Sequence, residues 1–91
     1  MTEAAYRVWG RVQGVGFRWW TRSRARSLRL AGTVRNSPDG SVEVRVRGPE
    51  DAVAELVRML HQGPPRSRVD AVEVEEIPSG SIPGDSFEIA S

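Results

Sequence analysis

The sequence contains no cysteine and no lysine, and it has only one histidine among its 91 residues. Without cysteine, the chain can form neither disulfides nor thiolate metal sites. Its apolar runs are far shorter than the roughly 18 residues of a membrane-spanning helix. Residues 1–5 also lack the basic start and apolar run of a secretory signal. These absences favour a protein of the reducing cytoplasm that makes no use of a membrane.

Charge is unevenly distributed along the chain, although the net charge is only +1. Residues 1–35 hold eight arginines and the single acid Glu3, whereas residues 36–91 hold five arginines and eleven acids. This segregation predicts an anionic ligand or partner near the N-terminal elements. All basic residues except the histidine are arginine, which favours bidentate recognition of phosphate or carboxylate. A compositional bias of the genome would also explain the missing lysine.

Hydrophobic periodicity predicts five strands and two helices within a single domain, residues 1–91. Apolar and polar residues alternate in the segments expected to be strands: 5–12, 30–36, 42–47, 69–77 and 86–90. The first helix, 18–28, would bury one face, made of Phe17, Thr21, Ala25 and Leu28. The second helix would begin with Pro49 as its first residue and end at Gly63, ahead of two prolines.

The order of these elements is strand, helix, strand, strand, helix, strand, followed by a short tail strand. The turn at residues 37–40, Ser-Pro-Asp-Gly, predicts that the second and third strands form an antiparallel hairpin. The order predicts an α+β protein with a ferredoxin-like split βαβ fold (βαββαβ). In this fold two helices cover one face of an antiparallel sheet. The fold by itself does not define a function.

A glycine-containing loop, residues 13–17, connects the first predicted strand to the first helix. Gly14 and Gly16 let successive backbone N–H groups converge on one point, as in an anion-binding nest. The loop leads into a helix N-terminus, which attracts negative charge, and Arg18 adds a guanidinium there. Together they predict a phosphate site that needs no metal. A Gly-x-Gly alone also fits an ordinary tight turn, and Arg18 alone fits a solvated residue at a helix start.

Longer strings of sequence favour the phosphate site over the ordinary turn. Residues 10–18, GRVQGVGFR, resemble the acylphosphatase signature G-R-V-Q-G-V-x-F-R. Residues 28–36, LRLAGTVRN, are similar to that family's L-G-L-x-G-W-V-R-N, and residues 39–44, DGSVEV, to its D-G-x-V-E-V. Shorter likenesses at residues 63–65 and 87–89 extend the resemblance over nearly the whole chain.

The sequence departs from the family pattern at two positions. Arg29 stands where the family often has glycine, at the predicted end of the first helix. An arginine there is strained if its φ is positive. Thr33 replaces the usual tryptophan, which would loosen local packing. Neither departure touches Arg18 or Asn36.

The resemblance implies an acylphosphatase, a metal-free and cofactor-free hydrolase that splits acyl phosphates into a carboxylate and inorganic phosphate. Its catalytic residues would be Arg18 and Asn36, the latter holding the attacking water. The phosphate would be bound by Arg18 and by the backbone N–H groups of the loop, namely those of Gln13, Gly14, Val15, Gly16 and Phe17. We expect a cytoplasmic monomer whose partner is a small-molecule acyl phosphate. A carboxylate leaves readily, so no general acid is needed.

Several other polar groups are expected to have structural roles. Asp39 would serve the hairpin turn rather than a metal, and His61 would lie in the last turn of the second helix. Acids near the fourth strand are expected to form a solvated face: Asp70, Glu73, Glu75 and Glu76.

Two alternative functions remain open at this point. One is a nucleic-acid module, in which Arg7, Trp9 and Arg11 would share a face with Arg45 and Arg47. Neighbouring acids and the small net charge disfavour it. The other is a catalytically silent member of the family or a regulatory domain of a larger protein, since similar domains begin hydrogenase-maturation proteins. The start at Met1 and the end soon after the last strand favour a stand-alone protein.

Overall fold

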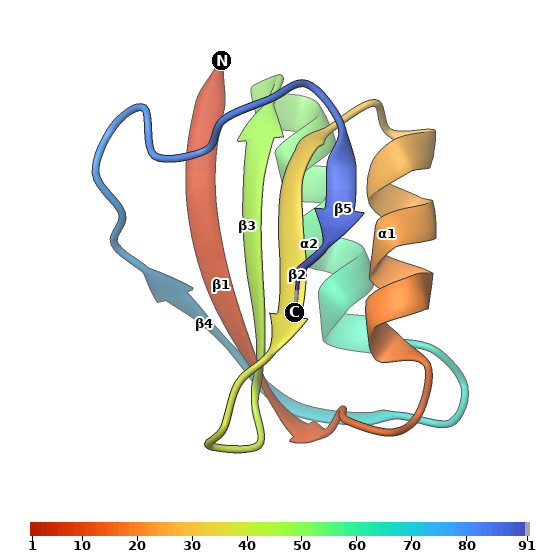
Figure 1. The fold of residues 1–91 in the computed structure, drawn as a ribbon. Helices are drawn as coiled ribbons and strands as arrows, with labels where there is room; N and C mark the ends of the chain where they lie inside the picture. The colour runs from red at the N-terminus through yellow and green to blue at the C-terminus, as the bar shows by residue number, and fades with distance from the viewer. Residues whose placement is uncertain (91) are drawn as a thin grey trace.

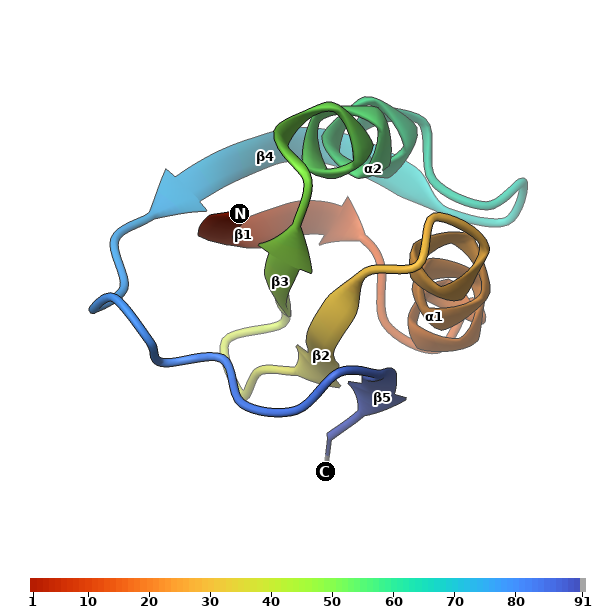
Figure 2. The same cartoon turned by 90° about the horizontal axis from the view of Figure 1, so that it is seen from above.

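The computed structural model describes residues 1–90 as a five-stranded sheet with two helices on one face (Figure 1 and Figure 2). The elements are, in chain order, β1 (Thr2–Arg11), α1 (Phe17–Ser27), β2 (Ala31–Asn36), β3 (Val42–Gly48), α2 (Glu50–Gln62), β4 (Arg68–Glu75) and β5 (Phe87–Ile89). The predicted α+β, ferredoxin-like fold is therefore confirmed. The main shift in boundaries is at β1, which begins at Thr2 because Thr2 and Glu3 pair with the end of β3.

The strands lie in the order β4-β1-β3-β2-β5. The first four form an antiparallel sheet, and β2 and β3 make the predicted hairpin. The short strand β5 pairs in parallel with β2, which makes the complete sheet mixed. Figure 2 shows why: the chain leaves β4 at one edge, crosses the side away from the helices and enters β5 at the other edge. Strand β5 therefore runs antiparallel to β4 and parallel to β2.

The hydrophobic core lies between the sheet and the helices. Alternate residues of β3 face the helices because side chains alternate along a strand, and all three valines there are fully buried: Val42, Val44 and Val46. The predicted face of α1 is confirmed for Phe17, Thr21 and Ala25, while Leu28 is half-buried. Each Val, Leu or Phe side chain buried in this way contributes roughly 1.5–3 kcal/mol to folding.

The end of α1 explains the unusual Arg29. The N–H of Leu30 donates to the carbonyl of Ala25, and the N–H of Arg29 donates to that of Arg26, both at 3.0 Å. This pair of bonds is a Schellman motif, which requires a left-handed residue after the cap. Arg29 takes that conformation with φ 58°, and it is the only residue other than glycine with positive φ in the part of the chain described. The expected strain is therefore present.

The second helix differs from its prediction at the start. Pro49 precedes α2 as its N-cap and is not its first helical residue, while Glu50 and Asp51 occupy the first turn. Proline suits this place because its ring fixes φ near the value of −58° found here, and the extended ψ of 143° leads the chain from β3 into the helix. Gly63 ends the helix with φ 70°. Within residues 1–90, neither helix has the length and apolar character needed to cross a membrane.

The topology brings the ends of several strands and helices together at one end of the molecule. Figure 1 shows that β1 and β2 end there and that α1 begins there, next to the turn between β2 and β3. The predicted phosphate loop and Asn36, the last residue of β2, therefore lie at the same end of the sheet. The fold brings together two segments that the sequence keeps apart.

Candidate active site

The loop between β1 and α1 is shaped by two glycines. Gly14 has φ 74° and Gly16 has φ 80°, both in the left-handed region that glycine adopts without strain. A β-carbon on either residue would meet no atom within 4 Å. The glycines are therefore needed for backbone conformation and not for close packing. The surface of the loop above them is open.

The backbone N–H groups of this loop are unpaired within residues 1–90. The first helical bond runs from the Trp20 N–H to the Gly16 carbonyl, and Gly16, the N-cap of α1, has no side chain to cap the helix. No N–H from Gly14 to Trp19 donates to a protein acceptor in the part of the chain described. No acidic residue lies in the first turn of α1 to satisfy them. A helix N-terminus with free amides and no acid nearby is suited to bind an anion.

Arg18 is the second residue of α1 and is half-buried. Its neighbours Val15 and Phe17 are buried in the core, which fixes the backbone on either side of the loop's second glycine. The Arg18 guanidinium makes no hydrogen bond or ion pair with any group in residues 1–90, unlike that of Arg7, which bonds to Glu75. Its donors are thus free for a ligand.

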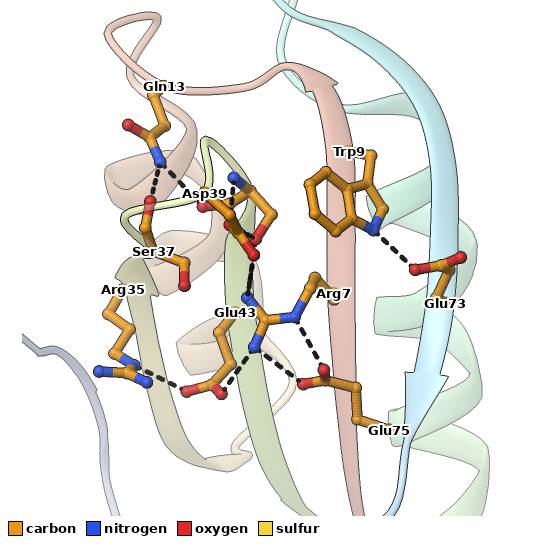
Figure 3. Close-up of polar contacts among 10 residues, drawn as sticks. Arg7, Trp9, Gln13, Arg35, Ser37, Asp39, Glu43, Glu73 and Glu75 are labelled. Atoms are coloured by element: carbon orange, nitrogen blue, oxygen red, sulfur yellow. Dashed lines mark hydrogen bonds and ion pairs between the residues drawn. The ribbon is translucent and has the colours of Figure 1, made fainter.

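Gln13 connects the loop to the hairpin turn that follows Asn36 (Figure 3). Its Nε2 donates to the Ser37 carbonyl at 2.8 Å and to the Ser41 carbonyl at 2.9 Å. The turn is itself closed by Asp39, whose Oδ1 accepts from the Ser41 N–H at 3.0 Å and from the Ser41 hydroxyl. These bonds from Ser41 hold the pKa of Asp39 below its usual range. The expected role of Asp39 in the hairpin is confirmed.

Asn36 ends β2 on the side of the sheet that faces the helices, because it alternates with the fully buried Val34. Its Oδ1 is buried and has no hydrogen-bond partner in residues 1–90, whereas its amide nitrogen is not among the buried unpaired atoms. The carboxamide therefore has an acceptor that faces the protein interior, while its donor nitrogen is not fully buried. The loop, Arg18 and Asn36 are thus gathered at one end of the fold.

The opposite face of the sheet holds a network of ion pairs (Figure 3). Arg7 Nε bonds to Glu75 at 2.7 Å, Arg7 Nη1 bonds to the Ser41 hydroxyl at 2.7 Å, and Arg7 Nη2 lies 3.3 Å from Glu43. Arg35 Nε adds a bond of 2.8 Å to Glu43. Burial alone would raise the pKa of Glu43, but the bond from Arg35 and the surrounding arginines lower it below its usual value.

The expectation that the acids near β4 form a solvated face is confirmed for Asp70, Glu73 and Glu76, which are exposed, whereas Glu75 is half-buried. Glu75 bonds to Arg7, and Glu73 accepts a hydrogen bond of 2.7 Å from the Trp9 indole. The sequence signal for this ion-pair network is the charge pattern across strands, since Arg7 lies opposite Glu43 and Glu73 in the sheet. That signal can be used only once the order of the strands is known.

The concave features of the surface lie apart from the loop. A groove of about 510 Å³ is lined by residues of α1, α2 and the segment after α2, Trp20, Arg24 and Gln62 among them. Neither Asn36 nor any residue from 13 to 18 lines it. Within residues 1–90, no three His, Cys, Asp or Glu side chains are grouped so that they could hold a metal. His61 is exposed in the last turn of α2, as predicted.

Comparison with known proteins gives the family. The model of the acylphosphatase family matches residues 4–89. The acylphosphatases of Mesorhizobium japonicum and Rubrobacter xylanophilus are 53% and 57% identical over 79 and 83 residues, which cover 87% and 90% of this chain and 84% and 74% of theirs. The crystal structure of the acylphosphatase from Bacillus subtilis matches with a TM-score of 0.90 and 36% identity, over 100% of both chains. The chain therefore belongs to the acylphosphatase family of hydrolases.

Proposed function

We propose that this protein hydrolyses acyl phosphates, without metal or cofactor, at the loop of residues 13–17 with Arg18 and Asn36. The observation that carries the proposal is that, among residues 1–90, the backbone N–H groups from Gly14 to Trp19 and the side chain of Arg18 within that row have no protein partner. The family supplies the type of reaction. The loop supplies a place where a phosphoryl group fits by charge and by hydrogen bonding.

The phosphoryl group would lie in the loop with its oxygens bound by Arg18 and by the backbone amides of Gln13, Gly14, Val15, Gly16 and Phe17. Phosphoryl transfer depends mainly on positioning and on stabilising the charge of three oxygens. The backbone amides are oriented by the fold before the substrate binds, and the Arg18 guanidinium adds positive charge. In this role they take the place of a metal ion.

Asn36 would hold the attacking water through its amide nitrogen, which donates to the water oxygen. The water oxygen forms a bond to phosphorus while the bond from phosphorus to the acyl oxygen breaks. The electron pair of that bond leaves with the carboxylate, and a water proton passes to a phosphate oxygen of the substrate. No general acid is required, because carboxylic acids have pKa values near 4 and the leaving group is stable as an anion.

The proposal includes broad acceptance of the acyl part of the substrate. The groups assigned here contact only the phosphoryl end, and the groove of about 510 Å³ is not lined by any of them.

The proposal also retains the expectation of a single-domain, cytoplasmic monomer. Size-exclusion chromatography with light scattering measures that oligomeric state directly.

The test is hydrolysis of benzoyl phosphate in the presence of EDTA, with inhibition by inorganic phosphate as the measure of binding. We expect Arg18→Ala to lose phosphate inhibition together with turnover, by about 100-fold or more in kcat. We expect Asn36→Ala to lose turnover and keep phosphate inhibition. Arg24→Ala, an exposed arginine on the same helix, is the control and should retain activity. Activity that survives both active-site changes contradicts the proposal.

A further inference from the structure

We propose that Thr21 is a positioning residue for Asn36: its hydroxyl donates to the Asn36 Oδ1 and so fixes the carboxamide toward the attacking water. This inference rests on the proposed function, because it assigns to Thr21 a role in the step that Asn36 performs. It adds Thr21, a residue of α1 outside the loop, to the proposed active site.

Thr21 is unusual among the residues that α1 buries. The others are Phe17 and Ala25, both apolar, while the Thr21 side chain is 0% exposed. Its Oγ1 is buried and has no hydrogen-bond partner in residues 1–90, not even the carbonyl four residues earlier. An unpaired buried hydroxyl destabilises a protein, and valine has nearly the same shape without it. Packing therefore does not account for the hydroxyl.

Asn36 carries the matching group. Its Oδ1 is also buried and without a partner in the described part of the chain, and it is an acceptor only, whereas the threonine hydroxyl can donate. Buried polar atoms without a partner are rare and call for an explanation. Here one orphan is a donor and the other an acceptor, so a single bond between them would satisfy both.

The topology places both atoms in the same interface. Helix α1 packs on β2, and Figure 1 shows the two running in opposite directions, with the end of β2 level with the first turns of α1. Thr21 lies one turn, about 6 Å, into the helix from Phe17. Asn36 faces the helices from the last position of β2, and the bond from Gln13 to Ser37 holds the start of the loop beside it. Neither atom has a partner among residues 1–90, so the proposed bond requires a change of side-chain torsion at Thr21, at Asn36 or at both.

The bond would matter because a carboxamide has two different ends. Rotation about its last side-chain torsion is broad, so an unrestrained Asn36 can present its oxygen where the nitrogen is needed. A donor at Oδ1 selects the orientation in which the nitrogen faces the water. Loss of this donor should therefore reduce kcat and leave phosphate binding in the loop unchanged.

The test compares Thr21→Val, which removes the hydroxyl at nearly constant shape, with Thr21→Ser, which keeps it. We expect Thr21→Val to lower kcat for benzoyl phosphate about tenfold, the effect of one hydrogen bond, with unchanged inhibition by phosphate. Thr21→Ser should retain most of the activity. Thr21→Val should have no further effect in an Asn36→Ala background. NMR of the Asn36 side-chain amide should show a shift in Thr21→Val and in Thr21→Ala.

Two results overturn the inference. One is a folded Thr21→Val or Thr21→Ala variant with unchanged kcat and an unchanged Asn36 amide signal, while Asn36→Ala remains inactive; the proposed function then stands without Thr21. The other is full activity in Asn36→Ala, which overturns the role of Asn36 and with it that of Thr21.

Discussion

The side-chain nitrogen of Gln13 lies 2.8 Å from the carbonyl oxygen of Ser37, although 24 residues separate them in sequence. One belongs to the loop that opens α1, and the other follows Asn36 at the end of β2. The same nitrogen also bonds to Ser41, so both ends of the hairpin turn are held. The two halves of the candidate site are therefore fixed to each other by a single amide.

Replacing Gln13 by alanine should loosen this connection. We expect the free energy of unfolding to fall by about 1–2 kcal/mol, the value of two hydrogen bonds, and inhibition by phosphate to weaken. Urea unfolding and phosphate inhibition of benzoyl phosphate hydrolysis measure the two effects. Gln62→Ala, at an exposed residue of the same type, is the control. Equal stability and equal inhibition in both variants would show that the connection has no effect.

Replacing Arg29 by glycine should stabilise the protein. Arg29 has φ 58° in the Schellman motif, and an L-residue pays roughly 1 kcal/mol or more for this conformation, whereas glycine does not. We expect an increase of about 1 kcal/mol, measured by urea unfolding, with unchanged activity. Arg29→Ala serves as the control, because it removes the charge and keeps the strain. An equal gain in the alanine variant would assign the effect to charge.

Stability should depend on Glu43 at acidic pH. The pKa of this carboxyl is below its usual value of 4.5 in the folded protein, so its charged form stabilises the fold above that value. The contribution is lost as pH falls from about 4.5 through the lower folded pKa. We expect Glu43→Gln to lower the free energy of unfolding by about 1–3 kcal/mol at pH 7 and by much less near pH 3.

Urea midpoints at both pH values measure this difference. Glu88→Gln is the control, because Glu88 also pairs with arginine but is more than half exposed. A Glu43→Gln variant that is equally destabilised at pH 7 and pH 3 would argue against a charge effect.

The open face of the sheet should not bind RNA. Arg7 is engaged by Glu75, Glu43 and Ser41, and the Trp9 indole N–H bonds to Glu73 (Figure 3). Because these two central members of the suggested platform already have partners, we expect no saturable binding of a fluorescent single-stranded RNA at low or moderate salt. Trp9→Ala is the control. Binding that falls with salt and requires Trp9 would restore the nucleic-acid alternative.

Features set by neighbouring residues were predictable from the sequence, and those set by strand order were not. The valines of β3 and the buried face of α1 follow from periodicity, and the strain at Arg29 follows from its place after the helix. The bond between Arg7 and Glu75 spans 68 residues, and no local pattern indicates it. The same holds for the direction of β5, which depends on the path of the chain across the sheet.

In the candidate site, too, the local features were predictable from the sequence and the long-range contacts were not. Its glycines and Arg18 form one continuous string, which local chemistry and family resemblance both single out. The side-chain bond from Gln13 to Ser37 and the burial of the Thr21 hydroxyl become visible only in the folded structure. Sequence could therefore name the parts of the site but not the contacts that orient them.

The short strand β5 has a consequence for solubility. It covers β2 through the Phe87–Ile89 ladder and through flanking bonds from Gly32 N–H to Ser86 and from Ala90 N–H to Val34. Without these few residues β2 would be a bare edge, and bare edges are templates for pairing with other copies and for aggregation. A truncation before Ser86 is therefore a hazard to expression and storage, quite apart from its effect on activity.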